Sequence, residues 1–203
     1  MKHRLLLASN NGKKLAELRS LLEPAGIELL AQGDLAIPEA DEPFDTFIEN
    51  ALAKARHAAR ASGMPALADD SGLCVDALQG LPGVRSSRFA LDHGAGAGDM
   101  ANNALLLDRL ASIDERGAAF VCVLVALRHA ADPEPLIAHG RWPLRVLREA
   151  WGEGGFGYDP IVQGVEQSEG SVATLAQAEK NRRSHRAQAM RVLLPTIRER
   201  WQW

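Results

Sequence analysis

The sequence predicts an α/β fold, as one domain of ordinary size or as two lobes that share a core. Residues 5–8 have the pattern of a buried strand, and a polar turn, an amphipathic helix and a second strand at residues 27–30 follow. The strongest strand pattern, at residues 118–127, is apolar on both faces, so we expect a central strand covered on both sides. Apolar residues make up 46% of the 203 residues, which is enough for a sizeable core.

The first predicted helix opens within the polar turn at residues 9–14, and Pro24 and Gly26 should end it. Its apolar stripe consists of Leu15, Leu18 and Leu22. The turn is not a Walker A loop, because it lacks the paired glycines and the Gly-Lys-Ser/Thr ending. Short polar side chains and two lysines at a helix start still suit a phosphate. The alternative is an ordinary Asn-Gly turn with an N-cap serine.

A second helix is predicted from a capping box at Thr46 and Glu49 to about residue 61. We expect its core stripe to comprise Ile48, Leu52, Ala55 and Ala59. Asn50, Lys54 and His57 share another face, which we expect to be mainly solvated. An Asn and a Lys on adjacent turns could instead bind phosphate.

The second half of the chain has weaker but readable patterns. They predict a helix at residues 102–113 and strands at residues 136–140 and 144–147. Ser184 is the expected N-cap of the last helix, in which Pro195 should produce a kink or a break.

Charge and cysteine content exclude several classes of protein. The net charge of −3 argues against broad nucleic-acid binding, which needs a basic face. Cys74 and Cys122 form no metal-type spacing, so we expect reduced core cysteines in a cytoplasmic protein. No apolar run approaches membrane-spanning length.

Two adjacent acids, Asp69 and Asp70, follow the apolar run at residues 65–68, and Ser71 and Gly72 come next. Acids at a buried strand end are costly unless they are paired, hydrogen-bonded or bound to a metal. A divalent-metal site with a carboxylate base is therefore one hypothesis, and a solvated acidic turn is the other. The acidic loop at residues 33–45 could likewise be plain surface or a source of metal ligands.

Two further stretches suggest a nucleotide. Phe156 lies among glycines at residues 152–157, where an aromatic ring could stack on a planar base. Residues 179–186 place basic side chains at a helix start, an unfavourable position unless an anion binds there. Together with the acids and the first turn, these stretches describe a nucleotide polyphosphate site with a divalent cation.

The same stretches, in the same order, resemble the RdgB-type inosine/xanthosine triphosphate pyrophosphatases. The motifs that carry the resemblance are residues 9–14, 46–51 with 54–55, 68–73, 80–90, 155–160, and 179–181 with 184–186. The resemblance implies one ITPase-like domain over residues 1–203, with a long mixed central sheet, flanking helices and two lobes around a nucleotide cleft. It also implies Mg²⁺-dependent hydrolysis of dITP, ITP, XTP and dXTP to the monophosphate and pyrophosphate, and a homodimer.

The resemblance assigns roles residue by residue. Asp70 would be the proton acceptor and a metal ligand, and Glu42 the second metal ligand, with Asp41 as its rival. The triphosphate would be bound by Ser9, Asn10, Asn11, Gly12, Lys13 and Lys14, of which Lys14 matches the family's lysine. Further substrate contacts would come from Ser71, Phe156, Gly157, Tyr158, Asp159, Lys180, His185 and Arg186. Lys54 matches the family's second helix.

Two segments depart from the family pattern, at residues 174–177 and 145–151, and both should lie beside the base pocket. The departures bear on purine selectivity more than on hydrolysis. A nucleotide sensor that binds without cleaving, and an enzyme acting on other modified nucleotides, are the rival interpretations.

Overall fold

A computed structural model describes residues 3–203, which form two compact units. Unit 1 contains the chain through Asp70 together with Cys122–Gly140 and His185–Trp203. Unit 2 contains Ser71–Val121 and Arg141–Ser184. A single domain with two lobes therefore stays a prediction, and each unit is described by itself.

Within residues 3–203, six strands form one mixed sheet in the order β2-β1-β3-β4-β5-β6. Their bounds are β1 His3–Leu7, β2 Ile27–Ala31, β3 Ala66–Val75, β4 Gly117–Leu127, β5 Leu136–Val146 and β6 Val162–Gly164. Strand β1 runs parallel to β2 and β3, whereas β5 and β6 are antiparallel. Strand β4 lies inside the order and is buried from Ala118 onwards, so the predicted central strand is confirmed.

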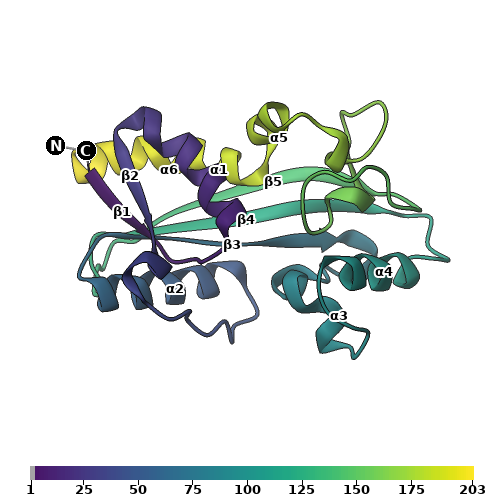
Figure 1. The fold of residues 1–203 in the computed structure, drawn as a ribbon, viewed down its shortest axis with the longest axis horizontal. Helices are drawn as coiled ribbons and strands as arrows, with labels where there is room; N and C mark the ends of the chain where they lie inside the picture. The colour runs from purple at the N-terminus through teal and green to yellow at the C-terminus, as the bar shows by residue number, and fades with distance from the viewer. Residues whose placement is uncertain (1–2) are drawn as a thin grey trace. The chain divides into compact units, whose positions relative to one another are not determined.

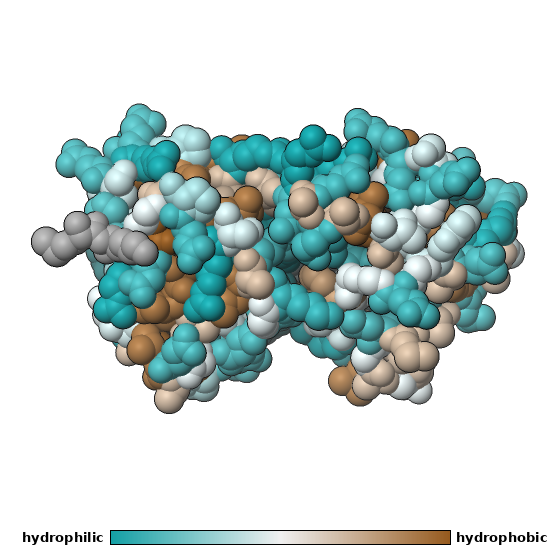
Figure 2. All heavy atoms as spheres, turned by 45° about the horizontal axis from the view of Figure 1, so that its top comes forward, coloured by the Kyte–Doolittle hydropathy of each residue, from teal (hydrophilic) through white to brown (hydrophobic). Residues whose placement is uncertain are grey.

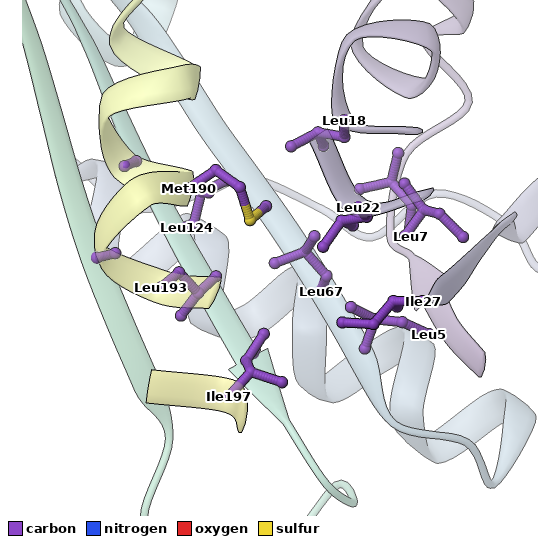
Figure 3. Close-up of a cluster of buried hydrophobic side chains, with 14 of the residues drawn as sticks. Leu5, Leu7, Leu18, Leu22, Ile27, Leu67, Leu124, Met190, Leu193 and Ile197 are labelled. Atoms are coloured by element: carbon purple, nitrogen blue, oxygen red, sulfur yellow. The ribbon is translucent and has the colours of Figure 1, made fainter. Parts of the chain in front are cut away.

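Unit 1 is a sheet covered by helices on both faces (Figure 1). Helices α1 (Gly12–Leu22) and α6 (His185–Trp201) pack on one face, and α2 (Phe47–Ser62) packs on the other. Alternation along the strands produces the two cores: Leu5 and Leu7 face α1 and α6, whereas Leu6 faces α2. In Figure 3, Met190 of α6 points toward the side chains of α1.

Unit 2 has its own apolar core beneath α4 (Asp99–Arg109). Its other α-helices are α3 (Phe89–Asp92) and α5 (Gln177–Arg183). The core of this unit includes Phe89, Leu106, Phe120, Trp142 and Tyr158.

Short 3₁₀ helices lie in both units: η1 Glu23–Ala25, η2 Gln32–Leu35, η3 Asp76–Leu78, η4 Gly83–Arg88, η5 Asp159–Ile161 and η6 Val172–Thr174.

Polar side chains cap two helices of unit 1. Asn11, rather than the expected serine, caps α1, because its Oδ1 accepts hydrogen bonds from the amides of Lys13 and Lys14. Thr46 Oγ1 caps α2 by accepting from the Glu49 amide, and its hydroxyl donates to the Glu49 carboxylate at 2.5 Å. The structural role predicted for Glu49 is therefore confirmed.

The predicted apolar stripe of α2 was wrong at its first turn, where Ile48 is 42% exposed. The buried face instead contains Asn50, 1% exposed, and Lys54, 8% exposed, together with alanines. Buried polar groups persist only with partners, and Asn50 bonds the backbone of Phe44 through its amide nitrogen and oxygen. His57, expected at the surface, is half-buried beside the Pro38 carbonyl oxygen.

Two strands are longer than expected. Strand β3 does not end at the acids but continues through them to Val75, which excludes a solvated acidic turn. Strand β5 joins the two predicted strands at residues 136–140 and 144–147 into one, and alternate residues along it are buried. Its Pro143 lies outside the paired β5–β6 residues, so the absence of its N–H breaks no bond of that ladder.

The helices of the second half differ slightly from their predictions. Helix α4 begins and ends about one turn earlier than expected, at Asp99 and Arg109. Helix α6 begins directly after Ser184 and is not divided at Pro195. None of the helices within residues 3–203 has the length and apolar character needed to cross a membrane. The surface drawn in Figure 2 is mostly hydrophilic, with hydrophobic residues in small groups.

Candidate active site

Asp69 and Asp70 are neighbours on β3, so their side chains project from opposite faces of the sheet. Leu67 belongs to the core under α1 and α6, and Ala68 to the core under α2. By the same alternation Asp69 faces α1 and α6, and Asp70 faces α2. The two adjacent acids are therefore not a pair on one metal, and they have separate surroundings.

Asp70 shares a lysine with the acidic loop. Lys54 Nζ lies 2.8 Å from Asp70 Oδ1 and 2.5 Å from Glu42 Oε1. Burial lowers the pKa of Lys54, but the two carboxylates outweigh burial and raise it, so the ammonium stays charged. Burial raises the pKa of Asp70, and the Lys54 ammonium opposes this shift without cancelling it. Asp70 Oδ2 is buried and has no hydrogen-bond partner within residues 3–203.

Asp69 lies on the other face in a chain of alternating charges. Its Oδ1 is 2.6 Å from Lys14 Nζ, and its Oδ2 is 2.6 Å from Arg186 Nε. Arg186 also pairs with Glu17 of α1, and the Cys122 thiol donates to Asp69 Oδ2 at 3.3 Å. Burial raises the pKa of Asp69, but Arg186 and Lys14 hold it well below its usual range. Asp69 is thus an anchor that pairs with two cations.

The turn at residues 9–14 lies where β1 ends. Strand β1 stops at Leu7 beside Leu67, whereas β3 continues past this point to the acids. Asn10, Asn11, Gly12 and Lys13 are exposed, and Ser9 and Lys14 are half-buried. The Ser9 hydroxyl accepts from the Asn11 amide at 3.2 Å, which fixes the turn. An exposed helix start with two lysines can receive an anion.

The start of α6 is packed tightly against β5. A Cβ on Gly140 would overlap the His185 carbonyl oxygen and lie 2.7 Å from the Ala189 amide nitrogen. His185 and Arg186 are 9% and 2% exposed. The Arg186 guanidinium binds Asp69 and Glu17, so direct contact between Arg186 and a base stays a prediction.

In unit 2, the glycine-rich loop holds an aromatic ring next to a cation. Lys180 Nζ lies 4.5 Å from the centre of the Phe156 ring and also pairs with Asp159. Asp159 Oδ2 accepts from the Phe156 amide at 2.7 Å. The Tyr158 hydroxyl donates to the Ser86 carbonyl at 2.9 Å. Ser71 is half-buried on β3.

Each unit therefore gathers part of the predicted set. In unit 1 the structure brings together Lys14 with Arg186 through Asp69, and Glu42 with Asp70 through Lys54. In unit 2 it brings together Phe156, Asp159 and Lys180. The sequence reasoning missed Glu17, Ser86, Asp99, Asn103 and Cys122. Only Glu17 could have been suspected from the sequence, because it is a charged residue one helical turn after Lys14 and next to the apolar stripe of α1.

The mixed sheet with helices on its faces defines an α/β protein. Unit 1 has charged clusters around the acids of β3 that suit a polyanion, and unit 2 has an aromatic ring that suits a planar group. The sequence model of the Ham1 family matches residues 5–196. The chain belongs to the Ham1 family.

Known proteins with similar sequences or structures align with nearly the whole of this chain. A dITP/XTP pyrophosphatase from Leptothrix cholodnii is 54% identical over 98% of each chain. Another protein of that name, from Aromatoleum aromaticum, is 55% identical over 97% of this chain and 98% of its own length. The structure of a HAM1 protein from Coxiella burnetii has a TM-score of 0.88 at 43% identity, covering 97% of this chain and 99% of that one.

Proposed function

We propose that this protein hydrolyses noncanonical purine nucleoside triphosphates, namely dITP, ITP, XTP and dXTP, to the monophosphate and pyrophosphate. The observation that carries the proposal is the Asp70 carboxylate, which is buried beside Lys54 and Glu42. Asp70 follows Leu67 on β3, and Leu67 pairs with Leu7, the last residue of β1 before the turn at residues 9–14. The names of the relatives, dITP/XTP pyrophosphatases, supply the substrate class. Such a reaction removes deaminated purines from the nucleotide pool.

The residues present fit a magnesium ion. Asp70 and Glu42 offer carboxylate oxygens, and Asp70 Oδ2 lacks a partner among the described residues. Residues 3–203 contain no group of three acids, histidines or cysteines that could hold a metal. Two carboxylates suit Mg²⁺, which keeps several waters and binds substrate phosphates as further ligands. When bound there, Mg²⁺ would neutralise charge on the phosphates during attack by water.

The residues of unit 1 would act on the phosphates. The turn at residues 9–14 and the ammonium of Lys14 would hold the triphosphate, and Lys54 would offer a second cation. Asp70 would accept a proton from the attacking water through its carboxylate. The water oxygen bonds to the α-phosphorus, the bond from that phosphorus to the bridging oxygen breaks, and pyrophosphate leaves.

The residues of unit 2 would act on the base. Phe156 offers a ring for stacking, and Lys180 lies beside it. The 6-oxo group of hypoxanthine accepts a hydrogen bond where the 6-amino group of adenine donates one. A pocket built around donors would leave adenine unsatisfied, a loss of about 1–3 kcal/mol for each buried unpaired group. His185, which belongs to unit 1, is also proposed to contact the base edge.

The proposal further includes a homodimer and a cytoplasmic location. Both follow from the resemblance to the pyrophosphatase family. The free thiols of Cys74 and Cys122 support the reducing compartment.

A screen of nucleotides tests the function. The purified protein would be incubated with each NTP and dNTP, including dITP and dXTP, with Mg²⁺ or with EDTA, and pyrophosphate and phosphate would be quantified separately. We expect pyrophosphate from dITP and XTP, little from dATP, and none with EDTA. Orthophosphate as the first product would place attack elsewhere than on the α-phosphorus. Binding of dITP without turnover would favour a sensor.

A further inference from the structure

The N–H and C=O groups of Phe156 and Gly157 all form hydrogen bonds within unit 2. The Phe156 amide donates to Asp159 Oδ2 at 2.7 Å, and its carbonyl accepts from the Asp159 amide at 3.2 Å. The Gly157 amide donates to Asp99 Oδ2 at 2.7 Å, and the Gly157 carbonyl accepts from Asn103 Nδ2 at 3.1 Å. Because both N–H groups already have acceptors within unit 2, the loop offers a ligand the Phe156 ring rather than these backbone donors.

Asp99 and Asn103 are four residues apart on α4, so they lie on one face of the helix. One side chain holds the N–H of Gly157 and the other holds its C=O, so the two sides of a single residue are fixed to one rigid element. We call these two side chains the α4 clamp. Gly157 has φ +61°, a left-handed conformation that glycine adopts without strain. The two hydrogen bonds of the clamp therefore require no strained backbone at Gly157.

The orientation of the Asn103 amide is fixed by the same contacts. Its Nδ2 donates to Gly157, whereas its Oδ1 is buried and has no hydrogen-bond partner in the described part of the chain. Turning the amide over would place Oδ1 against the Gly157 carbonyl, oxygen facing oxygen. Asn103 is therefore needed here as a donor, and Asp99 as an acceptor.

Phe156 immediately precedes the clamped residue, and its ring has a second constraint. Lys180 Nζ lies 4.5 Å from the ring centre, and Asp159 holds that ammonium while also binding the Phe156 amide. The backbone is thus fixed from α4, and the ring from Asp159 and Lys180. A change at α4 should shift the ring without removing any group that the proposed mechanism uses.

We infer that Asp99 and Asn103 are positioning residues that set the Phe156 ring for stacking on the purine base. This inference rests on the proposed function and extends it to residues on α4. We expect the clamp to act on base recognition rather than on the hydrolytic step, because both side chains bind the peptide groups of Gly157 next to Phe156.

A purely structural role for Asp99 makes a different prediction. Asp99 is the first residue of α4, and Gly98 before it offers no side-chain cap, so the Asp99 charge also favours the helix dipole. Asp99→Asn removes the charge but keeps an oxygen acceptor for the Gly157 amide. Asp99→Ala removes both. If Asp99 positions the loop, Asp99→Asn should keep the KM and the selectivity of the wild type, whereas Asp99→Ala should lose them. If Asp99 only stabilises the helix dipole, both variants should show a similarly lower Tm and unchanged selectivity.

The experiment compares Asp99→Ala, Asp99→Asn and Asn103→Ala with Asp108→Asn, which alters an exposed acid of the same helix. For each variant, kcat and KM would be measured with dITP and dATP, along with the Tm. We expect the KM for dITP to rise about tenfold in the two alanine variants, with kcat nearly unchanged and a reduced preference over dATP. Asp99→Asn and Asp108→Asn should resemble the wild type.

Amide hydrogen exchange supplies a readout that does not depend on activity. The Gly157 amide should exchange at least about tenfold faster in Asp99→Ala than in the wild type and in Asp108→Asn. Unchanged KM and selectivity in both alanine variants, with an active wild type, would overturn the inference and leave the proposed function intact. A wild-type protein that does not hydrolyse dITP would overturn both.

Discussion

Asp69 and Asp70 are neighbours on β3, but their side chains lie on opposite faces of the sheet and have different partners. Asp69 is saturated by Lys14, Arg186 and the Cys122 thiol, so it anchors cations. Asp70 keeps one buried oxygen without a partner within residues 3–203, so it has capacity for a proton or a metal. Replacement by asparagine should therefore reduce mainly turnover at Asp70 and mainly stability at Asp69.

Asp70→Asn should keep the fold and reduce turnover of dITP by about 100-fold or more, because it removes the proposed proton acceptor. Pyrophosphate release and chemical denaturation would be measured on the same preparation. Near-normal hydrolysis by a folded Asp70→Asn protein would contradict the assignment of Asp70 as the base.

Asp69→Asn should instead lower the free energy of unfolding, by about 3–5 kcal/mol, because it leaves Arg186 buried with a single carboxylate. Urea denaturation would measure the change, with Cys122→Ser as the control that keeps both charges. Equal stability of Asp69→Asn and the wild type would show that the charge chain does not support the fold.

The Lys54 ammonium pairs with both carboxylates, Glu42 and Asp70, that are proposed to hold a metal. Lys54→Met should therefore raise the affinity of the nucleotide-free protein for Mn²⁺ by about tenfold or more, while hydrolysis falls because a phosphate partner is lost. Electron paramagnetic resonance of Mn²⁺ titrations would measure the affinity. Lys13→Met, which removes an exposed lysine, serves as the control.

At the scale of elements, the contact between β5 and the start of α6 depends on Gly140. Gly140→Ala would push a methyl group into the backbone of His185 and Ala189 and should destabilise the protein by about 1–3 kcal/mol or more. Differential scanning calorimetry should show a lower Tm. Gly164→Ala is the matched control, because its added carbon would lie at ordinary contact distances of 3.6 Å or more.

The turn between β4 and β5 is stabilised by a buried carboxylate. Asp132 Oδ1 and Oδ2 each lie 2.9 Å from a guanidinium nitrogen of Arg128, and Asp132 also accepts from the amides of Arg128 and Glu134. The hydrogen bonds from Arg128 hold the pKa of Asp132 well below its usual range, although burial opposes them.

A lowered pKa in the folded state means that Asp132 stabilises the protein above its unfolded-state pKa, near 3.8, and that the contribution is lost as pH falls below this value. The difference in unfolding free energy between the wild type and Asp132→Asn should be about 1–3 kcal/mol at pH 7 and should shrink between about pH 4 and pH 2. Urea denaturation at each pH would measure it. A difference that does not change with pH would contradict this account.

The elements themselves were largely predictable from local patterns. Alternation and helical spacing identified β1, α1, β2 and β4, and Thr46 with Glu49 located the start of α2. The buried face of α2 was not predictable, because hydropathy assigns Asn50 and Lys54 to solvent. Only their partners, the Phe44 backbone and the Asp70 carboxylate, make burial favourable. Both partners lie outside α2, so the spacing of residues within the helix does not reveal them.

The site was predictable as a set of motifs but not as a set of contacts. The sequence located Asp70, Lys14 and Phe156 through the resemblance, and the roles assigned to them stay predictions. No local pattern indicates that Asp69 turns away from Asp70 toward Arg186, since that follows from β3 continuing through both acids. The α4 clamp was missed because its partner lies more than fifty residues away.

At the scale of the whole molecule, the homodimer is the remaining prediction. Light scattering coupled to size-exclusion chromatography should give twice the mass of one chain across a range of protein concentrations. A mass equal to one chain at micromolar concentration would contradict the proposal.

Strands β3, β4 and β5 each pass from one unit into the other, and the chain passes between them once more at Ser184 and His185. Neither unit is a continuous stretch of the gene. Recombination cannot exchange one unit for a homologous one in a single event, and no truncation yields either alone. A change of base selectivity therefore has to arise by local changes within the chain and not by exchange of a whole unit.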